Sequence, residues 1–248
     1  MTKKFLLFFL LFHGVTIAFA QRFDKAYGNP IIVFTEMNPR LLVIGSDVPT
    51  FALYEKGQII YKRMESGRTK FFEVKLSEEE TQKAVYSLCL NDSLMRLPGF
   101  IETTTKADQP TNELVLSFDS TKIVSVYGNL KADQKARKGA PKPFLKVYDR
   151  IARYENSQAR EWVPATIEVM LSDYNNSPEV PQKWPKGWPD LKSSKTVKQS
   201  DRLYSLYLDK KQLEELGRLL SSLKKKQAVE VNGRKFSVSY RLPFPNLR

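Results

Sequence analysis

Histidine and cysteine are almost absent from this sequence of 248 residues, which contains one of each, His13 and Cys89. His13 lies in an N-terminal segment that we expect to be removed, which would leave a mature chain without imidazole. Such a chain can build neither a Ser-His-Asp nor a Cys-His catalytic arrangement, and no His-ligated zinc site. A single cysteine forms no internal disulfide. We interpret Cys89, between Leu88 and Leu90, as a small buried apolar residue.

Long hydrophobic runs are also lacking, except at the N-terminus. Lys3 and Lys4 precede the apolar run 5–12, and Ala18-Phe19-Ala20 fits a small-x-small cleavage pattern. The alternative, a retained membrane anchor, is disfavoured because the run is shorter than the ~20 residues that span a bilayer. We therefore predict a signal peptide over residues 1–20, cleavage after Ala20, and a secreted or periplasmic protein. The mature chain would have 248 − 20 = 228 residues and a charge of 38 − 27 = +11.

Phosphate-binding glycine loops and EF-hand ladders are missing too, so we predict no cofactor and no metal site; the alternative is a calcium site built from scattered oxygens. Two kinds of enzyme survive these exclusions. A carboxylate pair could hydrolyse a glycoside, and a Ser-Lys dyad could form around Ser193-Ser-Lys195. The candidate acids near strand ends are Glu55, Glu168, Asp173 and Asp201. No spacing selects a pair among them, so we assign no catalytic residue and expect a protein that is not an enzyme.

Hairpins and capped helices are what the sequence does contain. Residues 51–61 read as two short strands around Glu55-Lys56-Gly57, since Gly57 can supply the positive φ of a tight turn. Further hairpins are predicted over 113–127 and over 229–238, where Asn232-Gly233 is a type I′ turn signature. Short strands are expected at 30–34, 40–44, 71–76, 166–172 and 202–208.

Three helices are predicted. One begins at the capping box Ser77/Glu80 and runs to about Asn91, one starts near Pro143, and one follows a second capping box, Asp209/Gln212. The segments 62–70 and 128–143 are expected to be exposed connections because they are charged and contain glycine or proline. The fold class predicted is α+β, with a mostly antiparallel sheet built from hairpins and about three packed helices. Residues 21–248 form one domain or two tightly packed lobes, 28–156 and 160–248.

Four segments carry a resemblance to a known group of proteins: Pro49–Tyr61, Leu76–Glu80, Ile123–Tyr127 and Phe236–Pro243. In order and spacing the chain resembles an uncharacterised family of secreted bacterial proteins, in which a Phe-x-Leu-Tyr-x-x-Gly hairpin precedes a capped helix and a final strand runs into Arg and Pro. Here Arg241-Leu242-Pro243 departs from the Arg-Pro-Leu order of that family. The resemblance implies fold and export, and it brings no activity.

Tryptophan provides the sharpest binding candidate. Trp184-Pro-Lys-Gly-Trp-Pro189 places two indoles four residues apart in a stretch braced by proline, and Trp162 lies upstream. Flat aromatic faces can stack on a sugar ring or a cation, so Trp162, Trp184, Lys186 and Trp188 are the predicted binding residues. The alternative is that the indoles pack as a plug over a sheet edge, which is the commoner fate of large aromatics.

Positive charge is spread over 131–146, 183–198 and 224–226. Such lysines form either a solvated basic surface or a site for a polyanion. Export and the absence of any nucleic-acid-binding motif argue against nucleic acid. We therefore expect a non-enzymatic binding or scaffolding domain at the bacterial cell envelope, with an envelope glycan or an anionic surface as partner and no membrane span. The alternative is a carboxylate-dependent polysaccharide hydrolase.

Overall fold

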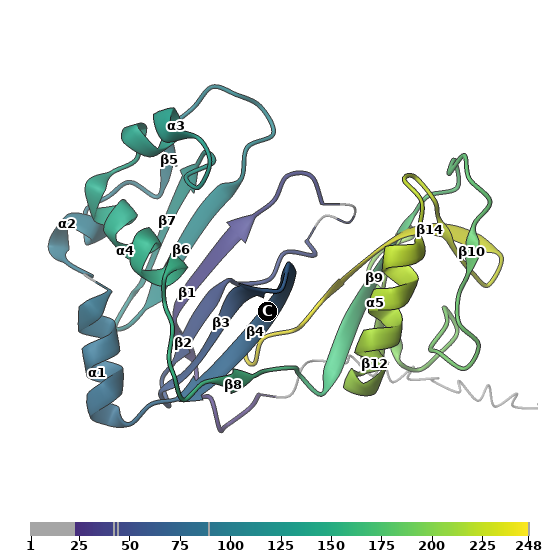
Figure 1. Ribbon diagram of the computed structural model, residues 1–248, viewed down its shortest axis with the longest axis horizontal. Helices are drawn as coiled ribbons and strands as arrows, with labels where there is room; N and C mark the ends of the chain where they lie inside the picture. Colours follow the sequence, from purple (N-terminus) through teal and green to yellow (C-terminus); the bar gives the residue numbers. More distant parts are fainter. Residues whose placement is uncertain (1–22, 42, 44, 89, 248) are drawn as a thin grey trace, which may run out of the picture.

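Two β-sheets, each with helices on one face, form the described part of the computed structural model, residues 23–41, 43, 45–88 and 90–247 (Figure 1). The predicted leader 1–20 and Cys89 lie outside these residues. The first sheet carries α1 to α4 on the face turned away from the second sheet, and α5 covers the second sheet (Figure 1). In the described part no helix is long and apolar enough to cross a bilayer.

The first sheet has eight strands in the order β5-β7-β6-β1-β2-β3-β4-β8. Its hairpins form as the turn residues predict: Gly57, with φ +81°, closes the β2–β3 turn, and its N–H donates to the Tyr54 carbonyl. All pairs are antiparallel except β5–β7. The strands are β1 (Pro30–Met37), β2 (Phe51–Tyr54), β3 (Gln58–Glu65), β4 (Arg68–Lys75), β5 (Phe100–Glu102), β6 (Thr111–Ser117), β7 (Thr121–Tyr127) and β8 (Arg160–Glu161).

The second sheet has six strands in the order β10-β13-β14-β9-β12-β11, and its β10–β13 pair is parallel. Asn232 and Gly233 both have positive φ, 49° and 78°, which confirms the predicted type I′ turn between β13 and β14. The strands are β9 (Thr166–Asp173), β10 (Gln182–Lys183), β11 (Thr196–Lys198), β12 (Leu203–Asp209), β13 (Val229–Val231) and β14 (Arg234–Arg241).

Five α-helices occur in the described residues. The capping box of α1 is formed as predicted, since the Glu80 N–H donates to Ser77 Oγ and the Ser77 N–H donates to Glu80 Oε2. The second predicted capping box, Asp209/Gln212, caps a 3₁₀ turn, η1 (Lys210–Gln212), that leads into α5. The helices are α1 (Glu78–Ser87), α2 (Asp92–Met95), α3 (Gln134–Gly139), α4 (Lys142–Ala152) and α5 (Leu213–Ser222).

The α+β class fits this architecture, but two finer predictions were wrong. The sheets are mixed rather than mostly antiparallel, because three-residue β5 and two-residue β10 each add to an edge in parallel. The described residues form five α-helices rather than about three. The two unexpected ones, α2 and α3, are only four and six residues long and begin at side-chain caps, Asn91 and Asp133. Such short helices contain too little periodicity to be recognised in the sequence.

Three local predictions also need correction. Residues 40, 41 and 43 form no strand, although Val43 is buried. The charged segment 62–70 is the distal half of the β3–β4 hairpin, which turns at Ser66-Gly67. The segment 128–143 contains α3, whose Ala136 is buried. The first prediction relied on an apolar run, which alone does not create a strand pairing. The other two relied on charge and on glycine or proline, which excluded neither a strand nor a short helix.

Two hydrophobic cores hold the molecule together. The first lies between the first sheet and its helices and includes Phe34, Phe51 and Phe144. The second joins the other face of β2 to β4 to the second sheet and α5. After β14 the chain runs back to the first sheet (Figure 1), where Phe244 packs edge-on against Phe71 and Trp162, with ring centroids 5.5 and 5.1 Å apart.

Candidate binding site

The loop 184–190, which we call the tryptophan loop, follows β10 and lies beside the β13–β14 turn. Together they enclose a depression of about 320 Å³. Strand pairing explains this position: β10 runs parallel to β13, and the Trp184 N–H donates to the Glu230 carbonyl at 3.0 Å. The depression is lined by residues 183–188, Asp190 and residues 230–233. It therefore gathers three of the four predicted binding residues, Trp184, Lys186 and Trp188.

The two indoles of the loop pack edge to face, with ring centroids 5.1 Å apart and an interplanar angle of 84°. Trp184 Nε1 donates to the Pro189 carbonyl at 2.8 Å. Both rings are half-buried and contact the second core. The two interpretations of the sequence thus both describe part of the arrangement, because the indoles pack inward against the core and also line the depression.

Polar contacts to the hairpin turn fix the loop. Asn232 Oδ1 accepts the Leu191 N–H at 2.9 Å, and Asn232 Nδ2 donates to Asp190 Oδ2 at 2.9 Å. Asp190 Oδ1 accepts the Lys192 N–H. The hydrogen bond from the Asn232 side chain, followed by the backbone N–H donors, lowers the pKa of Asp190 below its usual range. The site is therefore held by a carboxylate that stays ionised at neutral pH.

The charges around the depression are mostly neutralised by one another. Lys183 pairs with Glu230, and Asp190 is occupied by the contacts just described. Lys186 is exposed and has no ion pair among the residues that the structure describes. One ammonium group thus remains available at the rim, within a loop that presents two aromatic rings.

Trp162 does not belong to this site. It directly follows β8 and is only 7% exposed, packed between Phe71 and Phe244. The backbone N–H of Trp162 donates to the Phe71 carbonyl at 2.8 Å, which extends the pairing of β4 with β8. We therefore remove Trp162 from the candidate site and assign it to the core between the two sheets.

Most other residues of the site were not predicted as binding residues, and three of them matter for its polar contacts. Asp190, Glu230 and Asn232 line the depression with the indoles. The sequence marked Asn232 only as a turn residue, and Asp190 and Glu230 had no signal of their own. Asn232 reaches a loop more than forty residues away in the chain, and local sequence patterns contain no information about such a contact.

Three of the four candidate carboxylates for hydrolysis are hydrogen-bonded to other groups, and the fourth, Asp173, has a longer ion pair. Glu168 is 3% exposed and accepts from Ser205 Oγ and Arg241 Nε, both at 2.7 Å. Hydrogen bonds from Lys198 and from Asn29 lower the pKa of Asp201 and of Glu55, respectively. Asp173 lies 3.7 Å from Arg202 Nε. None of the four is bound to another carboxylate in these contacts.

The Ser-Lys dyad and a metal site were the remaining possibilities considered from the sequence. Ser193 Oγ accepts the Lys195 backbone N–H at 3.1 Å, so Ser193 and Lys195 belong to one turn. Among the described residues, no three His, Cys, Asp or Glu side chains gather into a metal-binding group.

A second hollow, a groove of about 790 Å³, lies beside α1. It contains apolar residues such as Ile31 and Val85, and Arg150 is its one charged lining residue. The Arg150 guanidinium already donates to the Ser87 carbonyl. The other polar residues that line it carry no charge: Thr81, Gln82, Tyr86, Ser87 and Asn91. The tryptophan loop combines two indoles with an exposed ammonium group, so it is the better candidate for specific binding.

Comparisons with known proteins assign no family. No family model matches the chain, and searches of curated proteins and of solved structures return no significant match.

Proposed function

We propose that this is an exported, non-enzymatic domain that binds a glycan of the bacterial cell envelope, and that it belongs to the secreted family that its hairpin and helix motifs resemble. The supporting observation is the depression at the tryptophan loop, where two indoles and the exposed ammonium of Lys186 surround one hollow. Sugar rings expose C–H groups that stack on indoles, and hydroxyl or acidic substituents suit the polar rim.

Preorganisation of the site favours binding. The loop is held in place before any ligand binds. Prolines flank the indoles, Asn232 bonds to Asp190, and the Trp184 backbone pairs with β13. Ligand binding then orders few additional groups, which limits the entropic penalty of association. An open depression of this size suits one or two sugar units of a longer polymer.

The alternative, a carboxylate-dependent polysaccharide hydrolase, has less support. A glycosidase needs two carboxyl groups about 5–10 Å apart across the substrate, one of them with a raised pKa. The pKa values of Glu55 and Asp201 are lowered instead, and Glu168 is neutralised by Arg241.

Binding is tested by titrating the purified protein with peptidoglycan fragments and lipopolysaccharide-derived oligosaccharides while recording tryptophan fluorescence. Truncation of an indole at the centre of a binding surface weakens binding by ~2 kcal/mol, or about thirtyfold. We expect this loss for Trp188→Ala. For Lys186→Gln we expect a salt-dependent loss of up to about fivefold, as for an exposed ion pair.

The matched control is Tyr86→Ala, because Tyr86 is an aromatic residue that is 89% exposed and far from the tryptophan loop, on α1. It should bind as the wild type does. If no envelope glycan binds saturably, or if Trp188→Ala and Tyr86→Ala behave alike, the proposed function is wrong. Export is tested separately by mass spectrometry of the protein from bacterial fractions, where we expect a chain that begins at Gln21.

A further inference from the structure

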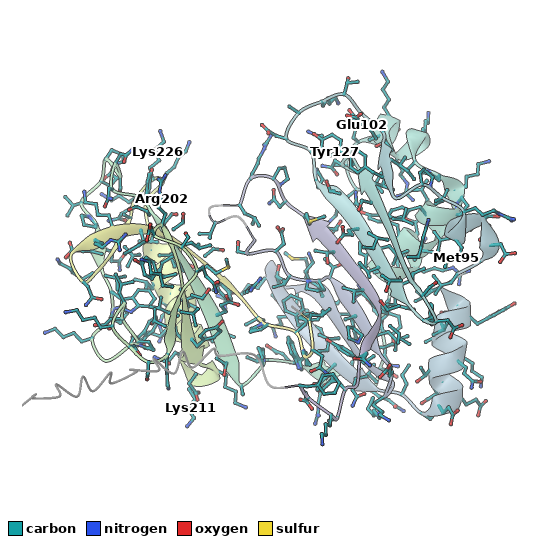
Figure 2. All side chains as sticks on the ribbon, turned by 180° about the vertical axis from the view of Figure 1, so that it is seen from behind. Met95, Glu102, Tyr127, Arg202, Lys211 and Lys226 are labelled. Carbon is teal, nitrogen blue, oxygen red and sulfur yellow. The ribbon has the colours of Figure 1, made fainter. Side chains whose placement is uncertain are left out.

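About half of the net positive charge is concentrated in residues 131–153. This stretch contains eight basic and two acidic residues, a net +6, whereas the whole chain without its predicted leader has +11. It comprises α3 and α4, which lie at the end of the molecule away from the second sheet in both views (Figures 1 and 2). The tryptophan loop belongs to the second sheet and is therefore remote from it.

The two acidic residues of this stretch are already engaged. Asp133 pairs with Lys106 at 2.8 Å, and Asp149 accepts two hydrogen bonds from Arg137 and lies 3.8 Å from Arg153. Five lysines remain exposed, with no ion pair in the described part of the chain. We call them the basic face: Lys131, Lys135, Lys138, Lys142 and Lys146.

Several charged residues of α4 destabilise this helix. Lys142 is the first residue, where the positive end of the helix dipole disfavours a cation, and Pro141 offers no side-chain cap. Lys142, Lys146 and Arg150 follow at four-residue spacing, which places like charges side by side. By contrast, α1 has a capping box, acids in its first turn and a Glu79–Lys83 pair. Departures from local stability rules of this kind are typical of functional surfaces.

The apolar side of α4 is unavailable to a partner. Phe144, Val147, Tyr148 and Ile151 are buried in the first core, so only the charged side of the helix is presented to solvent. A partner would therefore bind this side of the helix through electrostatic attraction, because it offers the partner no exposed apolar surface. A flat array of negative charge suits such a face, because exposed lysines on long flexible stems can approach it without a groove.

We infer that the basic face docks the protein peripherally on a membrane surface rich in anionic phospholipid. Lysines near such a surface contribute additively, each by roughly fivefold in the partition coefficient. Docking leaves the opposite end of the molecule, with the tryptophan loop, directed away from the membrane. The inference is independent of the glycan proposal, since it involves different residues.

Vesicle sedimentation tests this docking. The purified protein is mixed with vesicles of phosphatidylcholine alone, or of phosphatidylcholine with an equal part of phosphatidylglycerol. The test variant carries Lys135→Gln, Lys142→Gln and Lys146→Gln. The control variant removes the same charge from the second sheet's side through Lys210→Gln, Lys211→Gln and Lys225→Gln, three exposed lysines.

We expect binding to the anionic vesicles only, weakening as salt is raised. The test variant should bind about a hundredfold more weakly, and the control should bind nearly as the wild type does. Circular dichroism should show that the test variant is folded with an unchanged or higher melting temperature, because like-charge repulsion on α4 is relieved.

Several results would overturn the inference. Equal losses in both variants would show that net charge alone acts, and equal binding to neutral vesicles would exclude an electrostatic mechanism. Absence of vesicle binding at low salt would reject the docking. If the protein then binds a soluble acidic polysaccharide through the same three lysines, the basic face recognises a polymer instead.

Discussion

At the scale of single residues, Asp190 determines whether the candidate site keeps its shape. Its carboxylate connects the tryptophan loop to the β13–β14 turn through Asn232 and to its own loop through backbone N–H groups. All of these donors favour the ionised form, which is why the pKa of Asp190 is lowered. The position of the two indoles therefore depends on the protonation state of Asp190, which does not itself contact them in the aromatic pair.

We predict that the tryptophan loop loosens in acid. A carboxyl group with a folded-state pKa below its unfolded value of about 3.9 stabilises the fold above that value, and the stabilisation is lost as the pH falls through the lowered pKa. Below about pH 4 the tryptophan emission should therefore shift to the red, before global unfolding. In Asp190→Asn this early transition should be missing; if it persists there, another acid is responsible.

At the scale of elements, the β2–β3 hairpin depends on Gly57. Its φ of +81° lies in the left-handed region, and a Cβ at this position would lie 2.7 Å from the Leu76 carbonyl oxygen and 2.7 Å from Thr81 Oγ1. The Leu76 N–H also donates to the Gly57 carbonyl, so the turn is packed against the start of α1. Gly67, in the β3–β4 turn, has a similar φ of +75°, but nothing lies within 4 Å of its Cβ position.

The two glycines provide a matched prediction. Gly67→Ala should lower the free energy of unfolding by about 1 kcal/mol, which is the backbone strain of a left-handed alanine. Gly57→Ala adds a collision with backbone and should cost about 2–4 kcal/mol. Urea unfolding of both variants measures the difference. Equal losses would mean that the hairpin can move away from α1 without penalty.

At the scale of the whole molecule, a polar contact supplements the hydrophobic core between the sheets. Arg241, at the end of β14, binds buried Glu168 through Nε and the Gly45 carbonyl through Nη1 at 3.0 Å. Gly45 belongs to the connection between β1 and β2, so this guanidinium joins the second sheet to the first. Ser239 Oγ reinforces the same junction by donating to Ser46 Oγ at 3.0 Å.

We predict that Arg241→Met destabilises the protein by about 3 kcal/mol, the lower end of the range for breaking a buried ion pair, because Arg241 itself is partly exposed. The loss arises mainly from the unpaired Glu168 carboxylate. The double variant Arg241→Met/Glu168→Met should therefore be more stable than the single one. Chemical denaturation gives both values, and additive losses would refute the buried-charge explanation.

Chain-local features of the fold were predictable from sequence. Gly57, Asn232-Gly233 and the Ser77/Glu80 capping box act over four residues or fewer, and each forms as predicted. The parallel additions of β5 and β10, by contrast, depend on pairing with strands distant in the chain. At the candidate site, the aromatic pair was predictable from Trp184 and Trp188, but Trp162 could not be told apart from them by composition.

By itself, the sequence determined the chemistry available to this protein: a chain with one histidine and one cysteine, two indoles in a proline-braced loop, and an excess of lysine. It also determined the hairpins and capped helices, because turns and caps are encoded by neighbouring residues. Only the tertiary structure decided that Trp162 is core, that Asn232 braces the tryptophan loop, and that five lysines of α3, α4 and their flanks form no ion pair with any residue in the described part of the chain. Those outcomes depend on which distant segments meet when apolar surface is buried, and no local pattern records that.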